Sequence, residues 1–288
     1  MKGIILSGGL GTRLSPATSV ISKQILPIYD KPLVYYPLST LMLAGIKDIL
    51  IISTKRDIPM FRTLLGDGSY LGIKLSYKVQ EKPKGLADAF IIGEKFIGND
   101  DVCLILGDNI FYGDNLQVFL SESLNSTNNT QKATIFASYV NDPKRYGVVH
   151  FENDKIHSIQ EKPENPKSNY AVTGLYFYPN SVIEIAKNIK PSQRGEIEIT
   201  SVNNRYLQLS KLNLKVFKRG IVWLDTGTPN ALNNASNLIR SIEERQGLKI
   251  ACIEEIAYQM KYIKKESLRN YLKNKPDSDY FNYLRKKT

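Results

Sequence analysis

The segment of the chain best suited to chemistry is a glycine-rich stretch at residues 8–14, Gly-Gly-Leu-Gly-Thr-Arg-Leu. Glycine allows a tight turn and lets backbone N–H groups approach phosphate oxygens closely. Arg13 stands near the end of this stretch, and Lys23 follows ten residues later. A guanidinium group can bind two phosphate oxygens at once, whereas an ammonium group acts as a compact positive charge. The pattern favours a phosphate-binding loop, and a tight turn without a ligand is the alternative.

Two common nucleotide motifs are excluded by the details of this stretch. A dinucleotide-binding fingerprint starting at Gly9 would need glycine at position 14, where Leu14 stands. A P-loop needs Gly-Lys-Ser or Gly-Lys-Thr, and neither tripeptide occurs in the chain. The loop is therefore neither a NAD site nor a P-loop.

Two aspartates each follow a short apolar run. Asp108 comes after residues 102–106 and Gly107, and Asp225 comes directly after residues 221–224. Open α/β sheets bind ligands at the carboxyl ends of their strands, and carboxylate oxygens suit Mg²⁺ with nucleotide phosphates as further ligands. A turn is the alternative role for Asp108, and a turn or helix cap for Asp225. Spacing alone does not pair the two.

The composition is that of an ordinary globular protein, with 288 residues, 42% of them hydrophobic and 23% charged. The two cysteines, Cys103 and Cys252, are far apart and outside any Cys-x-x-Cys pair, which argues against a disulfide framework or a zinc site. No segment approaches the roughly 20 apolar residues of a membrane span. We therefore expect a cytoplasmic protein without a membrane partner.

The net charge is +11, from 39 lysine and arginine residues against 28 aspartate and glutamate residues. A basic balance can indicate nucleic-acid binding. Here the charges are dispersed, and the one modest cluster is at residues 285–287. We expect no nucleic-acid partner; a solvated basic surface and a cleft for a phosphate-rich small molecule both fit the charge.

The candidate residues must be positioned by the elements around them, and the first 110 residues alternate strand-like and helix-like segments. Apolar or alternating runs predict strands at 2–7, 48–53, 73–80 and 102–106. Helical spacing of apolar residues predicts helices at 32–44, 59–65 and 86–96. This alternation predicts an α/β fold with a mostly parallel sheet covered by helices.

The rest of the chain changes character. Strand-like runs separated by turn residues predict strands at 133–140, 146–151, 155–160, 171–178, 214–217 and 221–224. Helices are predicted at 182–189, 197–209, 230–245, 253–262 and 268–273. We expect one α/β body with a β-rich insertion and a helical C-terminal region.

The sequence around the glycine-rich stretch resembles the sugar-phosphate nucleotidyltransferase family, and in particular its glucose-1-phosphate thymidylyltransferases. The resemblance rests on Gly-Gly-x-Gly-Thr-Arg-Leu followed by Lys-Gln-Ile-Leu-Pro at 23–27. It extends over nearly the whole chain, through residues 29–32, 35–46, 145–149, 168–177 and 249–257. It implies a Rossmann-like three-layer nucleotidyltransferase fold with a mixed sheet. The implied division is a catalytic domain at 1–240 and a helical extension at 241–288 that serves an interface or regulation. Within the catalytic domain, a nucleotide-binding part covers about 1–130 and a sugar-phosphate-binding part covers about 131–228.

The resemblance implies that Arg13 and Lys23 neutralise the triphosphate and order the departing pyrophosphate, while Asp108 and Asp225 hold Mg²⁺; these four are the expected catalytic residues. The implied nucleotide contacts are Leu6, Gly8, Gly9, Gly11, Thr12, Arg13, Lys23, Gln24, Gln80, Pro83, Gly85 and Asp108. Gln80 and Gly85 are expected to meet thymine and deoxyribose. The chain departs from the family pattern Gln-Pro-x-Pro-Asp-Gly here, because Glu81 and Lys84 occupy two of its positions.

The resemblance also places a sugar-phosphate site in the middle of the chain. Glu161 is expected on sugar hydroxyls and Lys162 on the sugar's phosphate, with a surface salt pair as the alternative for the two. The implied contacts are Leu106, Tyr146, Gly147, Glu161, Lys162, Val172, Thr173, Gly174 and Trp223. Family members form tetramers with a second nucleotide site at a subunit interface. The matching regulatory residues here are Tyr112, Gly113, Asp114, Arg219, Gly220, Glu255 and Ile256.

The implied activity is Mg²⁺-dependent transfer of a thymidylyl group from dTTP to α-D-glucose 1-phosphate by direct in-line attack. The products are dTDP-glucose and pyrophosphate, in the first step of dTDP-L-rhamnose and related deoxysugar biosynthesis. We expect a homotetramer, with a feedback effector such as dTDP-rhamnose. The alternatives are the same chemistry with UTP, another nucleoside triphosphate or another hexose 1-phosphate, and a sugar-nucleotide sensor without catalysis. The sensor requires loss of Arg13, Lys23, Asp108 or Asp225, and all four are present.

Overall fold

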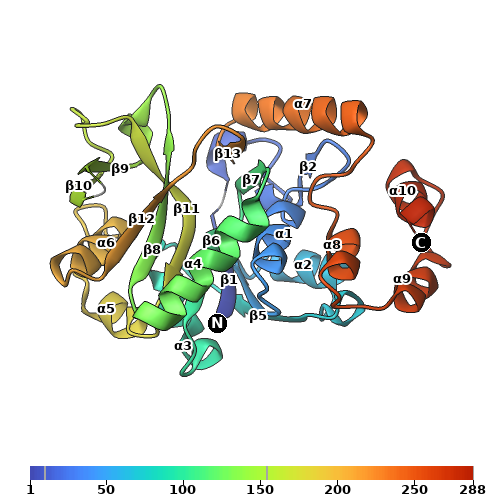
Figure 1. Ribbon diagram of the computed structural model, residues 1–288, viewed down its shortest axis with the longest axis horizontal. Coiled ribbons are helices and arrows are strands. Elements are labelled where there is room, and N and C mark those ends of the chain that lie inside the picture. The colour runs from blue at the N-terminus through green and yellow to red at the C-terminus, as the bar shows by residue number, and fades with distance from the viewer. Residues whose placement is uncertain (10, 154, 288) are drawn as a thin grey trace.

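A mixed β-sheet runs through the centre of the protein, with helices on both faces (Figure 1). The computed structural model describes residues 1–9, 11–153 and 155–287. Along β1 (Lys2–Ser7), Ile5 packs into one hydrophobic cluster while Ile4 and Leu6 pack into another. Because side chains alternate along a strand, both faces of the sheet are buried. The predicted α/β fold of three layers is confirmed.

The first part of the chain builds the parallel part of this sheet. Its strands are ordered β6–β1–β4–β5, and each neighbouring pair is parallel. The further strands are β4 (Asp48–Ser53), β5 (Lys74–Val79) and β6 (Val102–Leu106). The helices between them are α1 (Tyr35–Leu43), α2 (Ile58–Leu65) and α3 (Asp88–Ile97). Helix α1 begins later than the predicted residue 32, because β2 (Pro27–Ile28) and β3 (Lys31–Pro32) pair as a short hairpin.

The β-rich middle of the chain extends the same sheet. Strand β11 (Tyr170–Tyr178) pairs antiparallel with β6 and joins the two parts. The strands beyond it are β8 (Ala133–Tyr139), β9 (Gly147–Glu152), β10 (Lys155–Glu161) and β12 (Leu212–Val216). Helices α5 (Val182–Asn188) and α6 (Ile199–Gln208) pack on one face, and α4 (Leu116–Thr130) packs on the other. A separate antiparallel ribbon consists of β7 (Asn109–Gly113) and β13 (Ile221–Asp225).

The C-terminal region is helical, as predicted. It contains α7 (Pro229–Gln246), α8 (Ile253–Gln259), α9 (Lys265–Leu272) and α10 (Asp279–Lys287). In Figure 1, α7 runs along the top of the molecule and α9 and α10 lie at its right margin. The predicted domain boundary after residue 240 falls inside α7, and that division stays a prediction. Thr288 lies outside the described residues. None of the helices in the described part of the chain is long and apolar enough to cross a membrane.

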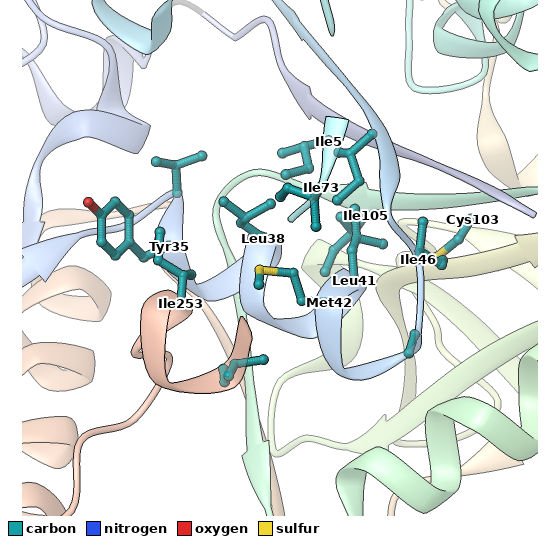
Figure 2. Packing of buried hydrophobic residues seen from close by; sticks show 14 of the residues in the cluster. Ile5, Tyr35, Leu38, Leu41, Met42, Ile46, Ile73, Cys103, Ile105 and Ile253 are labelled. Carbon is teal, nitrogen blue, oxygen red and sulfur yellow. The ribbon is translucent and has the colours of Figure 1, made fainter. Parts of the chain in front are cut away.

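Helix α1 forms the centre of the larger hydrophobic cluster. Figure 2 shows Leu41 and Met42 of this helix close to Ile105 of the central sheet, with Tyr35 and Ile253 of α8 packed at its other end. All five side chains are buried. This packing fixes the C-terminal helices to the parallel part of the sheet, whose strand ends carry the candidate site.

A buried charge network also ties the C-terminal region to the N-terminal part. It consists of Asp30, Lys31, Glu243 and Lys249. Lys31 Nζ lies 2.5 Å from Asp30 Oδ1 and donates to Glu243 Oε1 at 2.7 Å. Lys249 Nζ donates to Asp30 and lies 3.4 Å from Glu243 Oε2. The β2–β3 hairpin is thereby joined to the end of α7 by two positive and two negative charges.

Candidate active site

Two adjoining pockets open at the carboxyl ends of the parallel strands. Each has a volume of about 240 Å³, and they share Leu86, Leu106, Asp108 and Glu196. We call the pocket lined by Gly8, Gly9 and Gly11 the glycine-loop pocket, and the pocket that contains Trp223 the Trp223 pocket. Their position agrees with the rule that open α/β sheets bind ligands where the parallel strands end.

Most of the predicted nucleotide contacts line the glycine-loop pocket. They are Leu6, Gly8, Gly9, Gly11, Lys23, Gln24, Gln80, Pro83, Gly85 and Asp108. Gly85 has a φ of +101°, and a Cβ atom there would crowd the backbone of Ile197. The close approach of these two segments therefore requires glycine at position 85.

Thr12 and Arg13 do not line this pocket. They are exposed in a 3₁₀ turn, Thr12–Leu14, that follows Gly11, whose φ is +65°. Leu10, which belongs to the predicted motif, lies outside the described residues. The Arg13 charge nevertheless acts on the site, because it is one of the positive charges that oppose the rise in the pKa of Asp225.

The wall shared by the pockets carries a cluster of charged and polar groups. Lys23 Nζ donates to Asp108 Oδ2, and Asn109 Nδ2 donates to Asp108 Oδ1 at 2.9 Å. Pairing in the β7–β13 ribbon places Asp225 opposite Asn109. Thr226 donates to the backbone oxygen of Asp108 through both its N–H and its hydroxyl. The ribbon therefore brings together the two aspartates that spacing alone does not pair.

The electrostatics of this cluster disfavour charge on one carboxylate. Burial raises the pKa of Asp225, and the nearby negative charge of Asp108 raises it further. Lys23, Arg145 and Arg13 act in the opposite direction without cancelling the rise. A cation that bound between the two carboxylates would stabilise their ionised forms.

The Trp223 pocket contains all of the predicted sugar-phosphate contacts except one. They are Leu106, Tyr146, Gly147, Glu161, Lys162, Val172, Gly174 and Trp223. Thr173, the exception, is fully buried, and its hydroxyl has no hydrogen-bond partner among the described residues. Alternation along β11 explains the difference, because Val172 and Gly174 face the pocket while Thr173 faces the other side of the sheet.

Two polar arrangements shape this pocket. Thr200 donates to Glu161 Oε2 at 2.5 Å, and Arg194 donates to Glu161 Oε1 at 3.4 Å, so the carboxylate is oriented from two sides. Trp223 donates to Asn109 Oδ1 at 2.6 Å. The Trp223 ring meets Tyr146 edge to face, with centroids 5.2 Å apart. The pocket thus combines a carboxylate held in a fixed orientation, cations and a fixed aromatic wall.

Several lining residues escaped the sequence analysis. They are Leu86, Asn109, Arg145, Tyr176, Arg194, Glu196, Glu198, Ile199 and Thr200. The segment 194–200 carries one signal that can be recognised, because Arg194, Gly195 and Glu196 lie in the gap between two predicted helices, 182–189 and 197–209. Such a charged loop beside a sheet is typical of a binding segment.

The predicted regulatory residues lie apart from both pockets. Gly113 and Gly220 are neighbours, since a Cβ atom on Gly113 would overlap the backbone of Gly220. Tyr112 lies on β7, and its hydroxyl donates to Gln246 at 3.3 Å. The Glu255 carboxylate accepts from the Tyr283 hydroxyl at 2.6 Å and lies 3.7 Å from Lys287 Nζ. Asp114, Arg219 and Ile256 complete the set, whose role stays a prediction.

The donor set at the shared wall suits a divalent metal ion that takes most of its ligands from elsewhere. Among the described residues, no cluster of three or more His, Cys, Asp or Glu side chains could hold a metal ion. Two carboxylates, at Asp108 and Asp225, are nevertheless sufficient for an ion that takes its other ligands from phosphates and water, as Mg²⁺ does.

Comparison with known proteins gives one family. A model of the nucleotidyl transferase family matches residues 2–242. The chain is 52% identical over 285 residues to the glucose-1-phosphate thymidylyltransferase of Neisseria meningitidis, with 99% of this chain and 98% of the relative covered. It is 54% identical, with the same coverage, to the enzyme of that name from Mycolicibacterium smegmatis.

Solved structures agree with these relatives. A Bacillus anthracis protein assigned as a glucose-1-phosphate thymidylyltransferase, solved with sucrose, matches with a TM-score of 0.77 at 42% identity, covering 83% of this chain and 95% of its own. A UDP-glucose pyrophosphorylase solved with UDP-glucose matches with a TM-score of 0.73 at 26% identity, covering 84% and 98%.

Proposed function

The chain belongs to the nucleotidyl transferase family, and from this premise we propose that it transfers a thymidylyl group from dTTP to α-D-glucose 1-phosphate. The products are dTDP-glucose and pyrophosphate. The proposed place of the reaction is the first step of dTDP-L-rhamnose and related deoxysugar biosynthesis. Relatives more than 50% identical over nearly the full chain carry the corresponding name.

The observation that carries this proposal is the shared wall of the two pockets. Asp108 lines both, with Lys23 on one side and Asp225 on the other. A reaction between two bound phosphorylated molecules needs two such compartments that meet at their reacting ends. The glycine-loop pocket suits the triphosphate and its base, and the Trp223 pocket suits the sugar phosphate.

In the proposed step, a phosphate oxygen of glucose 1-phosphate attacks the α-phosphorus of dTTP. The bond from that phosphorus to the oxygen bridging to the β-phosphate breaks, and pyrophosphate leaves with the electron pair. The attacking oxygen is already ionised at neutral pH, so no strong general base is needed. The barrier arises mostly from alignment and from repulsion between anions, which positive charges reduce.

The side chains of this site divide that work. Lys23 and Arg13 neutralise the triphosphate and the departing pyrophosphate. Glu161, oriented by Thr200, accepts hydrogen bonds from sugar hydroxyls. Lys162 and Arg194 bind the phosphate of the sugar. Asp108 and Asp225 would hold Mg²⁺, which, when bound, neutralises charge on the phosphate oxygens.

Other parts of the proposal concern the whole protein. We place the reaction in the cytoplasm, where nucleoside triphosphates are available. We propose a homotetramer, a catalytic domain at 1–240 and a regulatory or interface extension at 241–288. A feedback effector such as dTDP-rhamnose would bind near Tyr112, Gly113, Arg219 and Glu255.

The test is pyrophosphate release with Mg²⁺ and glucose 1-phosphate, with dTTP, UTP, CTP and GTP assayed in parallel. Strong preference for dTTP with weaker use of UTP is the expected result. Release with another triphosphate alone would retain the chemistry and overturn the thymidylyl assignment. No release with any triphosphate or hexose 1-phosphate would leave a non-catalytic sugar-nucleotide sensor.

A further inference from the structure

Gln80 lies in the wall of the glycine-loop pocket, and its amide group is held by an aspartate behind it. Gln80 Nε2 donates to Asp88 Oδ2 at 3.1 Å. Both residues are buried, with 6% and 7% of their surfaces exposed. Gln80 follows β5 and Asp88 begins α3, so two successive elements fix the pair.

The chemistry of the two groups determines which way the amide faces. An ionised carboxylate only accepts hydrogen bonds, whereas a glutamine amide donates through Nε2 and accepts through Oε1. Asp88 therefore selects the orientation in which Nε2 points toward it. An amide partner at position 88 would select neither orientation, because it can donate as well as accept.

The opposite end of the amide faces the glycine-rich loop. A Cβ atom added at Gly8 would overlap Gln80 Oε1, which places this oxygen directly beside the loop. Among the described residues, no donor is hydrogen-bonded to Oε1. Gly8 and Gln80 both line the glycine-loop pocket. The pocket therefore presents a fixed acceptor to its ligand at this point.

A fixed acceptor discriminates between pyrimidines. Uracil and thymine carry an N–H donor at ring position 3, whereas cytosine carries a lone pair there. A lone pair that faces Oε1 would be repelled and would leave both acceptors without a donor, which costs binding energy in a buried site.

We propose that Asp88 is a positioning residue that sets base specificity by fixing the amide orientation of Gln80. This inference rests on the proposed function, because it assigns the base to the glycine-loop pocket. It accounts for selection of uracil and thymine nucleotides over cytosine nucleotides. Asp88 itself does not line the pocket and acts through Gln80.

The test compares dissociation constants of dUTP and dCTP, which differ only at ring positions 3 and 4, measured by calorimetry with Mg²⁺ present. In the unmodified protein, dUTP binds more tightly. Asp88→Asn is expected to reduce the dUTP preference about tenfold, which corresponds to about 1.4 kcal/mol. Asp88→Ala also frees the amide and should give the same reduction. Asp277→Asn, at an exposed position, removes the same charge and should leave the preference unchanged.

A double-mutant cycle separates this role from a merely structural one. In a Gln80→Ala background, Asp88→Asn should change the dUTP preference by less than about twofold, because the group on which it acts is gone. An unchanged preference in both Asp88 variants, or an equal reduction in the Gln80→Ala background, would overturn the inference. Thermal melting of each variant checks that it is folded.

Failure of this inference differs from failure of the proposed function. The preference is a ratio of binding constants and needs no turnover. A protein that prefers dUTP but forms no sugar nucleotide would refute the proposed transfer while the Asp88 variants still test the inference. A protein that forms dTDP-glucose with the same base preference in all Asp88 variants would retain the function and refute the inference.

Discussion

Two clusters of charged side chains occupy opposite situations in this protein. The buried charge network of Asp30, Lys31, Glu243 and Lys249 contains two charges of each sign, and its side chains are 1% to 17% exposed. The cluster at the active site joins Lys23, Asp108 and Asp225 at a wall between two open pockets. One cluster is enclosed by protein, and the other faces ligand space.

The ionisation of one group in each cluster shows the difference. In the network, burial lowers the pKa of Lys249, but hydrogen bonds and charges from Asp30 and Glu243 outweigh this and raise it. The charged form of Lys249 is therefore stabilised. In the active site, burial and Asp108 raise the pKa of Asp225, so its charged form is disfavoured. Each charge of the network has an opposite charge beside it, whereas a bound ion or ligand would be needed to stabilise the charge of Asp225 in the active site.

The largest expected effect is a loss of activity when a carboxylate of the active-site cluster is removed. Asp225→Asn removes a carboxylate that would hold Mg²⁺, and we expect turnover to fall at least about 10³-fold, which is about 4 kcal/mol of transition-state stabilisation. The melting temperature should stay the same or rise, because a disfavoured charge is gone. Steady-state kinetics and thermal melting measure the two effects. Asp108→Asn should lower turnover to a similar extent, the exposed Asp277→Asn is the matched control, and full activity with normal magnesium dependence would refute the metal assignment.

A substitution in the buried charge network should instead lower stability and leave activity nearly unchanged. Glu243→Gln leaves Lys31 and Lys249 with one carboxylate partner, and breaking a buried pair costs about 3–5 kcal/mol of unfolding free energy. Urea denaturation measures this loss. The kcat of the folded variant should be close to normal, because the network lies outside both pockets. Unchanged stability, or a loss of kcat with normal stability, would show that the network does not serve stability alone.

Arg194 tests whether cations in the Trp223 pocket serve the ligand or the protein. Its side chain is 43% exposed, and its guanidinium reaches Glu161 and Glu198. Arg194→Ala should raise the KM for glucose 1-phosphate about tenfold or more, the loss expected for one charge-assisted hydrogen bond. The KM for dTTP should change little. Arg205→Ala, on the exposed side of α6, is the control, and an equal change in both KM values would contradict the role.

Glu254 is a buried carboxyl group outside both clusters, and its substitution should have the smallest effect, which is on stability. Burial raises its pKa, although hydroxyl donors at Tyr280 and Tyr271 act in the opposite direction. Because the folded-state pKa lies above the unfolded one, this group's contribution to stability is present below the unfolded pKa and is lost as pH rises toward the folded value. Glu254→Gln should remove this pH dependence, at most about 1.4 kcal/mol per pH unit. Denaturation at pH 4.5 to 7.5 measures it, and parallel curves for both proteins would show no such coupling.

The strands of the parallel part could be predicted almost to the residue, because 102–106 is apolar throughout and 48–53 is apolar at its four central positions. Helix α4 could not be predicted in this way. Its sequence is rich in Ser, Asn and Thr, and its buried face includes Ser123 and Thr127, so helical periodicity in apolar residues is weak. Tertiary packing against the sheet outweighs the low intrinsic preference.

The candidate site, too, could be predicted only in part from the sequence. Glycine spacing and Lys23 mark the loop after the first strand without structural help. The meeting of Asp108 with Asp225 depends on the register of the β7–β13 ribbon, which joins residues more than a hundred positions apart. Such long-range pairing leaves no local signal in the chain. Arg194 was missed for a related reason, since only the folded loop turns it toward Glu161.

We propose that the two pockets hold the two substrates of one displacement. The most direct test of this proposal is reaction of dTTP with glucose 1-phosphate carrying ¹⁸O in its phosphate oxygens, followed by mass spectrometry of both products. We expect dTDP-glucose that keeps all of the label and pyrophosphate that contains none. Labelled pyrophosphate, or no labelled sugar nucleotide, would contradict it.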